Sequence, residues 1–389
     1  MKIRSVTLGN NLTWPVSAGE FAKAARFFER AKAVFGEGGI EVQTVRLAAQ
    51  PLRTVRAEPV QLALAVESAC KEHNIGYCSL GPASHDSARI AELIRSTSIV
   101  FASMVTAQDG AVDFDAVRAA AAVIHDVAGT TDLGFGNLRF GALAHCGPNI
   151  PFFPAAYHDG GHPKFTLALQ CADIAVEAFS GEDSLAELER RFADGLVAAD
   201  RQLYPLAKQL EREFAIEFLG ADFCPAPFPS DQESIGGAVE RFGVERFGAF
   251  GTLFAAAAIT RTVRSAPLHR WGFNGLMLPV LEDSVLAART ADGSFSVNDL
   301  LLYSAVCGTG LDALPIPGDT SADEIAALIL DVSALSVALE RKPLTVRLLP
   351  VPGRGAGEPT EYAFDYFANG RVLPVKGLAA TKLFARANS

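Results

Sequence analysis

The chain has 389 residues, 49% of them hydrophobic, so it is long enough to bury a large core. Its 44 acidic and 34 basic side chains give a formal charge of -10, which argues against nucleic acid or an anionic membrane as the main partner. The apolar stretch after Lys2 and Arg4 is too short for a signal peptide, and the longest apolar run, at 253–259, is too short to span a bilayer. We therefore expect a cytoplasmic protein.

The six cysteines are dispersed along the chain and form no CxxC pair. In a chain of this length, such spacing favours reduced thiols over a disulfide framework or a zinc knuckle. A thiol nucleophile remains possible. The cysteines are Cys70, Cys78, Cys146, Cys171, Cys224 and Cys307.

The first hundred residues predict alternating strands and helices, because period-2 apolar runs alternate with segments of helical apolar spacing. The predicted strands are 3–8, 41–47, 76–80 and 99–102, and the predicted helices are 18–35, 60–72 and 87–95.

The middle of the chain continues in the same way. It predicts helices at 114–126, 163–178, 184–214 and 236–260, and strands at 140–144, 215–219 and 275–281. Strands that alternate with helices indicate a mainly parallel sheet, open or closed into a barrel, with ligands at the carboxyl ends of the strands.

The C-terminal tail differs in character. Strand patterns at 344–351, 361–367 and 371–375 are separated by turn residues, including Asn369-Gly370. We therefore predict an α/β barrel over 1–342 and an antiparallel β appendage over 343–389, which packs on the barrel as an edge or lid.

Cys307 follows an apolar stretch and lies in a glycine-rich turn. Gly308 and Gly310 permit a tight loop and close approach of a ligand to the backbone, and Asp312 follows. A thiol presented from such a loop can act as a nucleophile. The alternative is that Cys307 is a small buried hydrophobic residue.

Glu282 and Asp283 follow the apolar run 276–281, so they fall where a parallel strand ends. Paired acids there can bind a divalent cation, hold a substrate amine or act as a general base. Alternatively, Asp283 or Ser284 caps the next helix and Glu282 is solvated. Asp222, ahead of the proline-rich segment 224–229, is a third candidate for a pocket wall or metal ligand.

His158 and His162 would form a zinc-ligand pair on a helix, but Gly160 and Gly161 between them favour a flexible surface loop. The glycines at 134–136 and 248–251 match neither the dinucleotide fingerprint nor the P-loop. No nucleotide cofactor is indicated, and a divalent cation is the one cofactor that the acids suggest.

Five motifs, at 151–158, 226–229, 251–253, 275–283 and 305–312, resemble the domain of unknown function 711 family, also called uncharacterised protein family 0210. The similarity runs from Ile3 to the strand at 347–350, which is nearly the whole chain.

The resemblance implies a fold like that of pyruvate formate-lyase and other glycyl radical enzymes. This fold is a ten-stranded α/β barrel with a hairpin loop that carries the catalytic cysteine, to which Cys307 corresponds by its position in the motif. Those enzymes need Arg-Val-x-Gly-Tyr near the C-terminus, whereas 371–375 reads Arg-Val-Leu-Pro-Val. Because Pro374 replaces the radical glycine, we expect no stored radical.

Two hypotheses follow. In the first, the protein is a thiol-centred enzyme that acts on a small polar metabolite, with Cys307, Glu282 and Asp283 as catalytic residues. The expected substrate-binding residues are Asp312, Asp222, Gly308, Gly310, His158 and Asn274. In the second, it is a non-catalytic metabolite- or cation-binding regulatory protein on the same fold. The alanine-rich helices also suggest a homo-oligomer.

Overall fold

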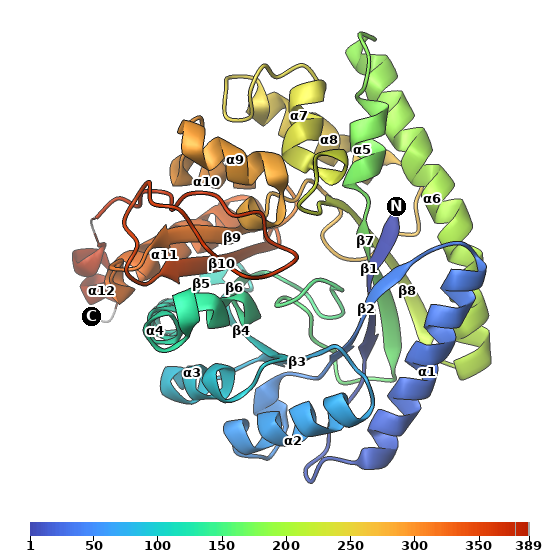
Figure 1. The fold of residues 1–389 in the computed structure, drawn as a ribbon. Helices are drawn as coiled ribbons and strands as arrows, with labels where there is room; N and C mark the ends of the chain where they lie inside the picture. The colour runs from blue at the N-terminus through green and yellow to red at the C-terminus, as the bar shows by residue number, and fades with distance from the viewer. Residues whose placement is uncertain (378, 388–389) are drawn as a thin grey trace.

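A curved sheet of ten strands forms the centre of the protein in a computed structural model that describes residues 1–377 and 379–387 (Figure 1). The strands are β1 (Lys2–Gly9), β2 (Val42–Ala48), β3 (Tyr77–Pro82), β4 (Val100–Gln108), β5 (Ala111–Val112), β6 (Phe140–Ala144), β7 (Lys164–Gln170), β8 (Glu217–Ala226), β9 (Gly310–Pro317) and β10 (Leu344–Val351). Their order is β8-β7-β1-β2-β3-β4-β6-β10-β9, and β5 pairs with β4.

Helices lie around the outside of the sheet (Figure 1). They are α1 (Ala18–Glu37), α2 (Pro59–Glu72), α3 (Ser87–Ser96), α4 (Phe114–Thr130), α5 (Ala172–Ala178), α6 (Leu185–Phe214), α7 (Ile235–Arg241), α8 (Thr252–Ser265), α9 (Ser284–Asp292), α10 (Val297–Ser304), α11 (Ala322–Ala338) and α12 (Thr381–Ala387). Short 3-10 turns are η1 (Leu52–Thr54), η2 (Asp132–Arg139), η3 (Asp231–Glu233) and η4 (Val280–Glu282). No helix of the described ranges is both long and apolar enough to cross a bilayer.

The predicted β-α-β opening is confirmed. β1 and β2 run parallel, with Ile3 opposite Val42 and Leu8 opposite Leu47, and α1 connects them. The buried residues of α1 recur every three or four positions and so form one face of the helix. On this face, Phe27 packs against Phe165 of β7, with ring centroids 5.1 Å apart. The sheet is mainly parallel, but β7 on β1 and β10 on β6 are antiparallel, so it is mixed.

The two edge strands of the sheet both contact the segment between α8 and α9. Ala221 of β8 forms an isolated parallel bridge with Arg270, and Asp312 of β9 forms another with Pro279. This irregular segment therefore lies beside both ends of the sheet.

The predicted helix at 163–178 is wrong in its first half, which is strand β7 followed by the short helix α5. β7 pairs with β1 on one side and β8 on the other, and its residues after Lys164 are buried. An apolar run buried on both faces lacks the alternation that marks a half-exposed strand, so its pattern resembles that of a buried helix.

The predicted helix at 236–260 is interrupted. It forms α7 and α8, separated by a turn in which Gly243, Gly248 and Gly251 have positive φ angles of 115°, 101° and 106°. A Cβ on Gly248 would lie 2.2 Å from the carbonyl oxygen of Ser294, so the backbone approach itself requires glycine.

The predicted strand at 275–281 is also wrong. The segment is irregular and ends in η4, and within the described chain its β-type pairing with β9 is the isolated Pro279–Asp312 bridge. Pro279 has no N–H to donate to a ladder, and Gly275 packs directly on the backbone of Gly308.

The predicted antiparallel β appendage does not form. The residues at 344–351 are β10, which pairs with β6 and β9 inside the central sheet. The patterns at 361–367 and 371–375 form no strands, and this part of the described chain has a single antiparallel bridge, Pro359–Arg371. Aromatic packing decides its path, because Tyr362 and Phe367 are buried against Leu281 and Leu349.

Candidate functional site

A cavity lies inside the curve of the sheet and contains an empty space of about 840 Å³, part of it open to solvent. Its wall takes side chains from β1, β2, β9 and β10 and from the loop between β6 and β7. That loop lies within the curve of the sheet (Figure 1), and all of its residues from 150 to 156 are buried.

Five charged side chains face this cavity: Arg4 of β1, Arg46 of β2, Glu282 of η4, Asp312 of β9 and Arg347 of β10. Seven aromatic residues also line it, namely Tyr77, Phe101, Phe152, Phe153, Phe273, Phe364 and Tyr366. The wall therefore combines apolar rings with a few converging charges, which is typical of a binding site.

Four of the charges form one network. Arg347 donates from Nη2 to Glu282 Oε1 at 2.6 Å and from Nε to Asp312 Oδ1 at 2.6 Å, while Arg4 pairs with the other Glu282 oxygen. Burial raises the pKa of Glu282, but Arg4 and Arg347 outweigh it and hold that pKa below its usual value. For Asp312, burial together with the negative charge of Glu282 outweighs Arg347 and raises the pKa.

Arg46 differs from the other two arginines. Among the described residues, no carboxylate lies within ion-pair distance of its guanidinium, which donates from Nε to Thr44 Oγ1 at 3.0 Å. The guanidinium lies over the rings of Tyr77 and Phe153, at 5.5 and 5.2 Å from their centroids. Burial, followed by the charge of Arg4, lowers the pKa of Arg46 to about 10, so it remains a cation at neutral pH.

Two uncharged polar atoms on the cavity wall have no hydrogen-bond partner within the described ranges. They are Thr309 Oγ1 and Gln43 Oε1, both without access to solvent. Thr309 as a residue is only 2% exposed. Because buried polar groups are normally satisfied, each is a place where a bound molecule can supply the missing bond.

The structure separates the predicted pair of acids. Glu282 faces the cavity and is ion-paired, whereas Asp283 faces the helices, where it accepts from the backbone N–H groups of Ile235, Val285 and Leu286 at 2.5, 3.0 and 2.9 Å. Of the two readings of Asp283, the helix cap is therefore confirmed. The reading of Glu282 as a solvated side chain is wrong, since it is 5% exposed.

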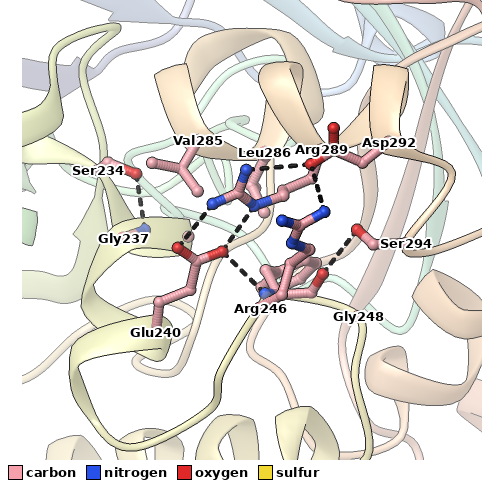
Figure 2. A network of polar contacts seen from close by, with 12 residues as sticks. Ser234, Gly237, Glu240, Arg246, Gly248, Val285, Leu286, Arg289, Asp292 and Ser294 are labelled. Carbon is pink, nitrogen blue, oxygen red and sulfur yellow. Dashed lines mark hydrogen bonds and ion pairs between the residues drawn. The ribbon is translucent and has the colours of Figure 1, made fainter.

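A second polar network joins the same helices nearby. Figure 2 shows Glu240 of α7 facing Arg289 of α9, and two hydrogen bonds of 2.7 and 2.9 Å connect them. Arg289 also reaches Asp292, which pairs with Arg246. Each of these charges has a partner within the protein, so the network stabilises the α7–α9 contact.

Asp222 and Asn274 organise a loop that borders the cavity. Asp222 accepts from the N–H groups of Cys224, Phe273 and Asn274, and Asn274 Oδ1 accepts from Phe223 N at 3.0 Å. Neither is on the cavity wall, but Phe273 is. They hold the wall in place.

Cys307 is completely buried in the main apolar core and is not on the cavity wall. Its Sγ accepts from Gly310 N at 3.4 Å, and the turn that carries it lies between α10 and β9. Gly308 packs on Gly275, and Gly310 on Thr345. The segment that enters the curve of the sheet is instead the loop after β6, which carries Cys146.

His158 lies in a loop, as the two glycines predicted, but the predicted surface position is wrong for this residue, since His158 is fully buried. His162 is exposed. The His158 ring contacts Asn149 Oδ1 and the carbonyl oxygen of Gly161, both at 3.1 Å. In the part of the chain that the structure describes, no group of three or more His, Cys, Asp or Glu side chains is arranged to hold a metal ion.

Arg4, Arg46 and Arg347 were missed in the sequence, although two of them, Arg4 and Arg347, carry a usable signal. Arg4 interrupts the apolar strand Lys2–Gly9, and Arg347 interrupts the otherwise uncharged strand Leu344–Val351. A charge inside a strand that is buried on both faces is rarely tolerated without a partner, so it marks a site.

The profile of the family described as Uncharacterised ACR (DUF711) matches residues 1–365. A UPF0210 protein of Pyrobaculum aerophilum is 31% identical over 351 residues, which cover 83% of this chain and 76% of the relative. A UPF0210 protein of Pyrobaculum islandicum is 32% identical over 82% of this chain and 76% of its own length, and one of Listeria innocua is 25% identical over 99% and 93%.

Proposed function

Because this chain belongs to the DUF711 (UPF0210) family, whose name states no reaction, we propose a function from the cavity: the protein binds a small anionic metabolite, with Arg46 as the principal contact. The observation that carries the proposal is the half-buried guanidinium of Arg46, which has no carboxylate partner among the described residues and faces a cavity lined by aromatic rings.

The charge of the cavity supports this proposal. Three arginines and two carboxylates face the same cavity, and both carboxylates form ion pairs with Arg4 or Arg347. One positive charge therefore remains uncompensated in a largely apolar surrounding. A buried charge without a partner is unfavourable, so an anionic ligand stabilises the site.

Thermal unfolding in the presence of small anions tests the proposal. Acetate, benzoate, citrate and inorganic phosphate are added to the wild type, to Arg46→Gln and to Arg95→Gln, which removes an exposed ion pair with Asp126 outside the cavity. We expect at least one anion to raise the Tm of the wild type and of Arg95→Gln but not that of Arg46→Gln. Equal stabilisation of all three proteins would overturn the proposal.

The thiol-centred reaction of Cys307 stays a prediction. Its burial in the core and its absence from the cavity wall favour the binding function over a reaction at this thiol. If a reaction takes place in the cavity, Glu282 and Asp312 are the titratable carboxyls that face it. Small-molecule binding is compatible with either outcome.

We also propose that the sheet closes as a barrel, as the resemblance to the pyruvate formate-lyase fold implies. The bridges Ala221–Arg270 and Pro279–Asp312 support closure through the segment between the two edge strands. A crystal structure in which this segment leaves either edge would contradict the barrel.

A further inference from the structure

Resting on the proposed function, we infer that the ligand is a planar aromatic monocarboxylate rather than a phosphate or a small aliphatic acid. Two independent properties of the cavity carry this inference. The first is the net charge of the cavity, which determines the charge of the ligand. The second is the aromatic wall around Arg46, which determines the chemical class of the rest of the ligand.

The charge favours a monoanion. Both carboxylates are counted as ionised, since each accepts a 2.6 Å hydrogen bond from Arg347. The cavity then carries one net positive charge, and a monocarboxylate neutralises it. A phosphate dianion would leave one negative charge uncompensated among apolar side chains, which costs free energy. The fork of Arg46 also matches the two oxygens of one carboxylate.

The wall around Arg46 is aromatic. Phe101 contacts the rings of both residues that flank the guanidinium: its centroid lies 5.5 Å from that of Tyr77, at an interplanar angle of 84°, and 5.1 Å from that of Phe153, at 70°. Arg46 therefore emerges from a cluster of three rings that pack edge to face. A planar ring attached to the bound carboxylate can extend the same edge-to-face packing, which a saturated ring of equal size cannot do.

Isothermal titration calorimetry with matched probes tests this inference. Benzoate is compared with cyclohexanecarboxylate, which has the same charge and a similar size but no aromatic ring, and with benzyl alcohol, which has the ring but no charge. Inorganic phosphate represents the dianion. We expect benzoate to bind about two- to tenfold more tightly than cyclohexanecarboxylate. Benzyl alcohol and phosphate are expected to bind more weakly than either carboxylate.

Two variants separate the two parts of the argument. Phe101→Leu keeps an apolar side chain but removes the ring that joins Tyr77 and Phe153, so the ratio of the benzoate affinity to the cyclohexanecarboxylate affinity should fall to about one. Arg46→Gln removes the cation, and both carboxylates should bind about tenfold more weakly or worse. Unfolding by urea checks that each variant is folded.

Each outcome has a definite meaning. If benzoate and cyclohexanecarboxylate bind equally and both depend on Arg46, the aromatic ligand is refuted and the proposed function stands. Phosphate binding more tightly than both carboxylates, with dependence on Arg46, refutes the monocarboxylate alone. Probe binding that is unchanged in Arg46→Gln, or no binding of any probe, refutes both proposals.

Discussion

Glu282 and Asp312 meet on a single guanidinium, although 29 residues lie between them in the chain and they belong to different elements. Arg347 reaches Glu282 with Nη2 and Asp312 with Nε, each at 2.6 Å. The shared cation lets two acids lie side by side in the cavity. Their pKa values shift in opposite directions: Arg4 and Arg347 outweigh burial and lower that of Glu282, whereas burial and the negative charge of Glu282 outweigh Arg347 and raise that of Asp312. Carboxyls with opposite shifts at one site are common where proton transfer takes place.

Glu282→Gln should destabilise the fold. The substitution removes the shared partner of Arg4 and Arg347 and leaves buried positive charge uncompensated, so we expect a loss of about 3–5 kcal/mol. The measurement is the free energy of unfolding in urea. Arg95→Gln, which breaks an exposed pair, should cost about 1 kcal/mol or less. A similar loss in both variants would mean that the buried network contributes little.

Glu282 and Asp312 should contribute to the pH dependence of the unfolding free energy with opposite signs. The depressed pKa of Glu282 stabilises the fold above its usual value of 4.5, and this contribution is lost as the pH falls through the folded-state pKa. Glu282→Gln should therefore flatten the loss of stability at acidic pH. The raised pKa of Asp312 acts in the opposite sense, because stability is lost as the pH rises from its usual 3.8 through the folded-state value.

Urea unfolding at a series of pH values checks this prediction, with Asp312→Asn as the counterpart of Glu282→Gln. We expect Asp312→Asn to steepen the rise of stability with pH relative to the wild type, since the opposing contribution is gone. Parallel pH profiles for both variants would contradict the assigned shifts.

Gly310→Ala should disrupt the start of β9. Gly310 has φ of 100°, and a Cβ there would lie 2.4 Å from the carbonyl oxygen of Thr345, which cannot move without breaking the β9–β10 ladder. The matched control is Gly353→Ala, at φ of 74°, where nothing lies within 4 Å of the added atom. We expect roughly 1 kcal/mol for the control.

Expression yield and the Tm of the two alanine variants measure the difference. Gly310→Ala should be insoluble or melt well below Gly353→Ala. Equal Tm values would mean that the ladder at Thr345 adjusts to the added atom.

Asp283→Ala should act through helix capping, independently of metal. It leaves the N–H groups of Ile235, Val285 and Leu286 without their acceptor, so we expect a loss of roughly 3 kcal/mol. Asp113→Ala, which removes the cap from Ala116 N and an exposed contact with His85, should cost about 1 kcal/mol. If Mg²⁺ or Ca²⁺ raises the Tm of the wild type but not that of Asp283→Ala, the hypothesis that Asp283 binds a metal ion would be supported instead.

Cys307 should resist alkylation in the folded protein. All six cysteines are buried, and Cys307 has no exposed surface. We expect iodoacetamide to modify its peptide only at the rate of unfolding, as mass spectrometry after timed quenching would show. Rapid modification of Cys307 alone, in protein that remains folded, would instead support the thiol-centred reaction and place this residue in reach of a ligand.

The sequence by itself determined the class of fold and part of the cavity. Regular apolar spacing predicted β1 to β4 and the helices between them, because side chains two, three or four residues apart decide which face of an element is buried. Glu282 and Asp312 were identified for the same local reason, since each follows or interrupts an apolar run. The helix at Lys164–Gln170 and the tail strands were wrong, because burial on both faces or aromatic packing outweighed the local pattern.

Only the tertiary structure decided how the charges combine. Arg4 lies on β1, Arg46 on the neighbouring strand β2, and Arg347 on β10, near the other end of the sheet. The curved sheet brings all three side chains to one cavity. No local spacing encodes that Arg4 and Arg347 neutralise the two acids while Arg46 keeps its charge. That division depends on which side chains approach within a few ångströms after the sheet has curved, and electrostatic energy between buried groups is set by those distances.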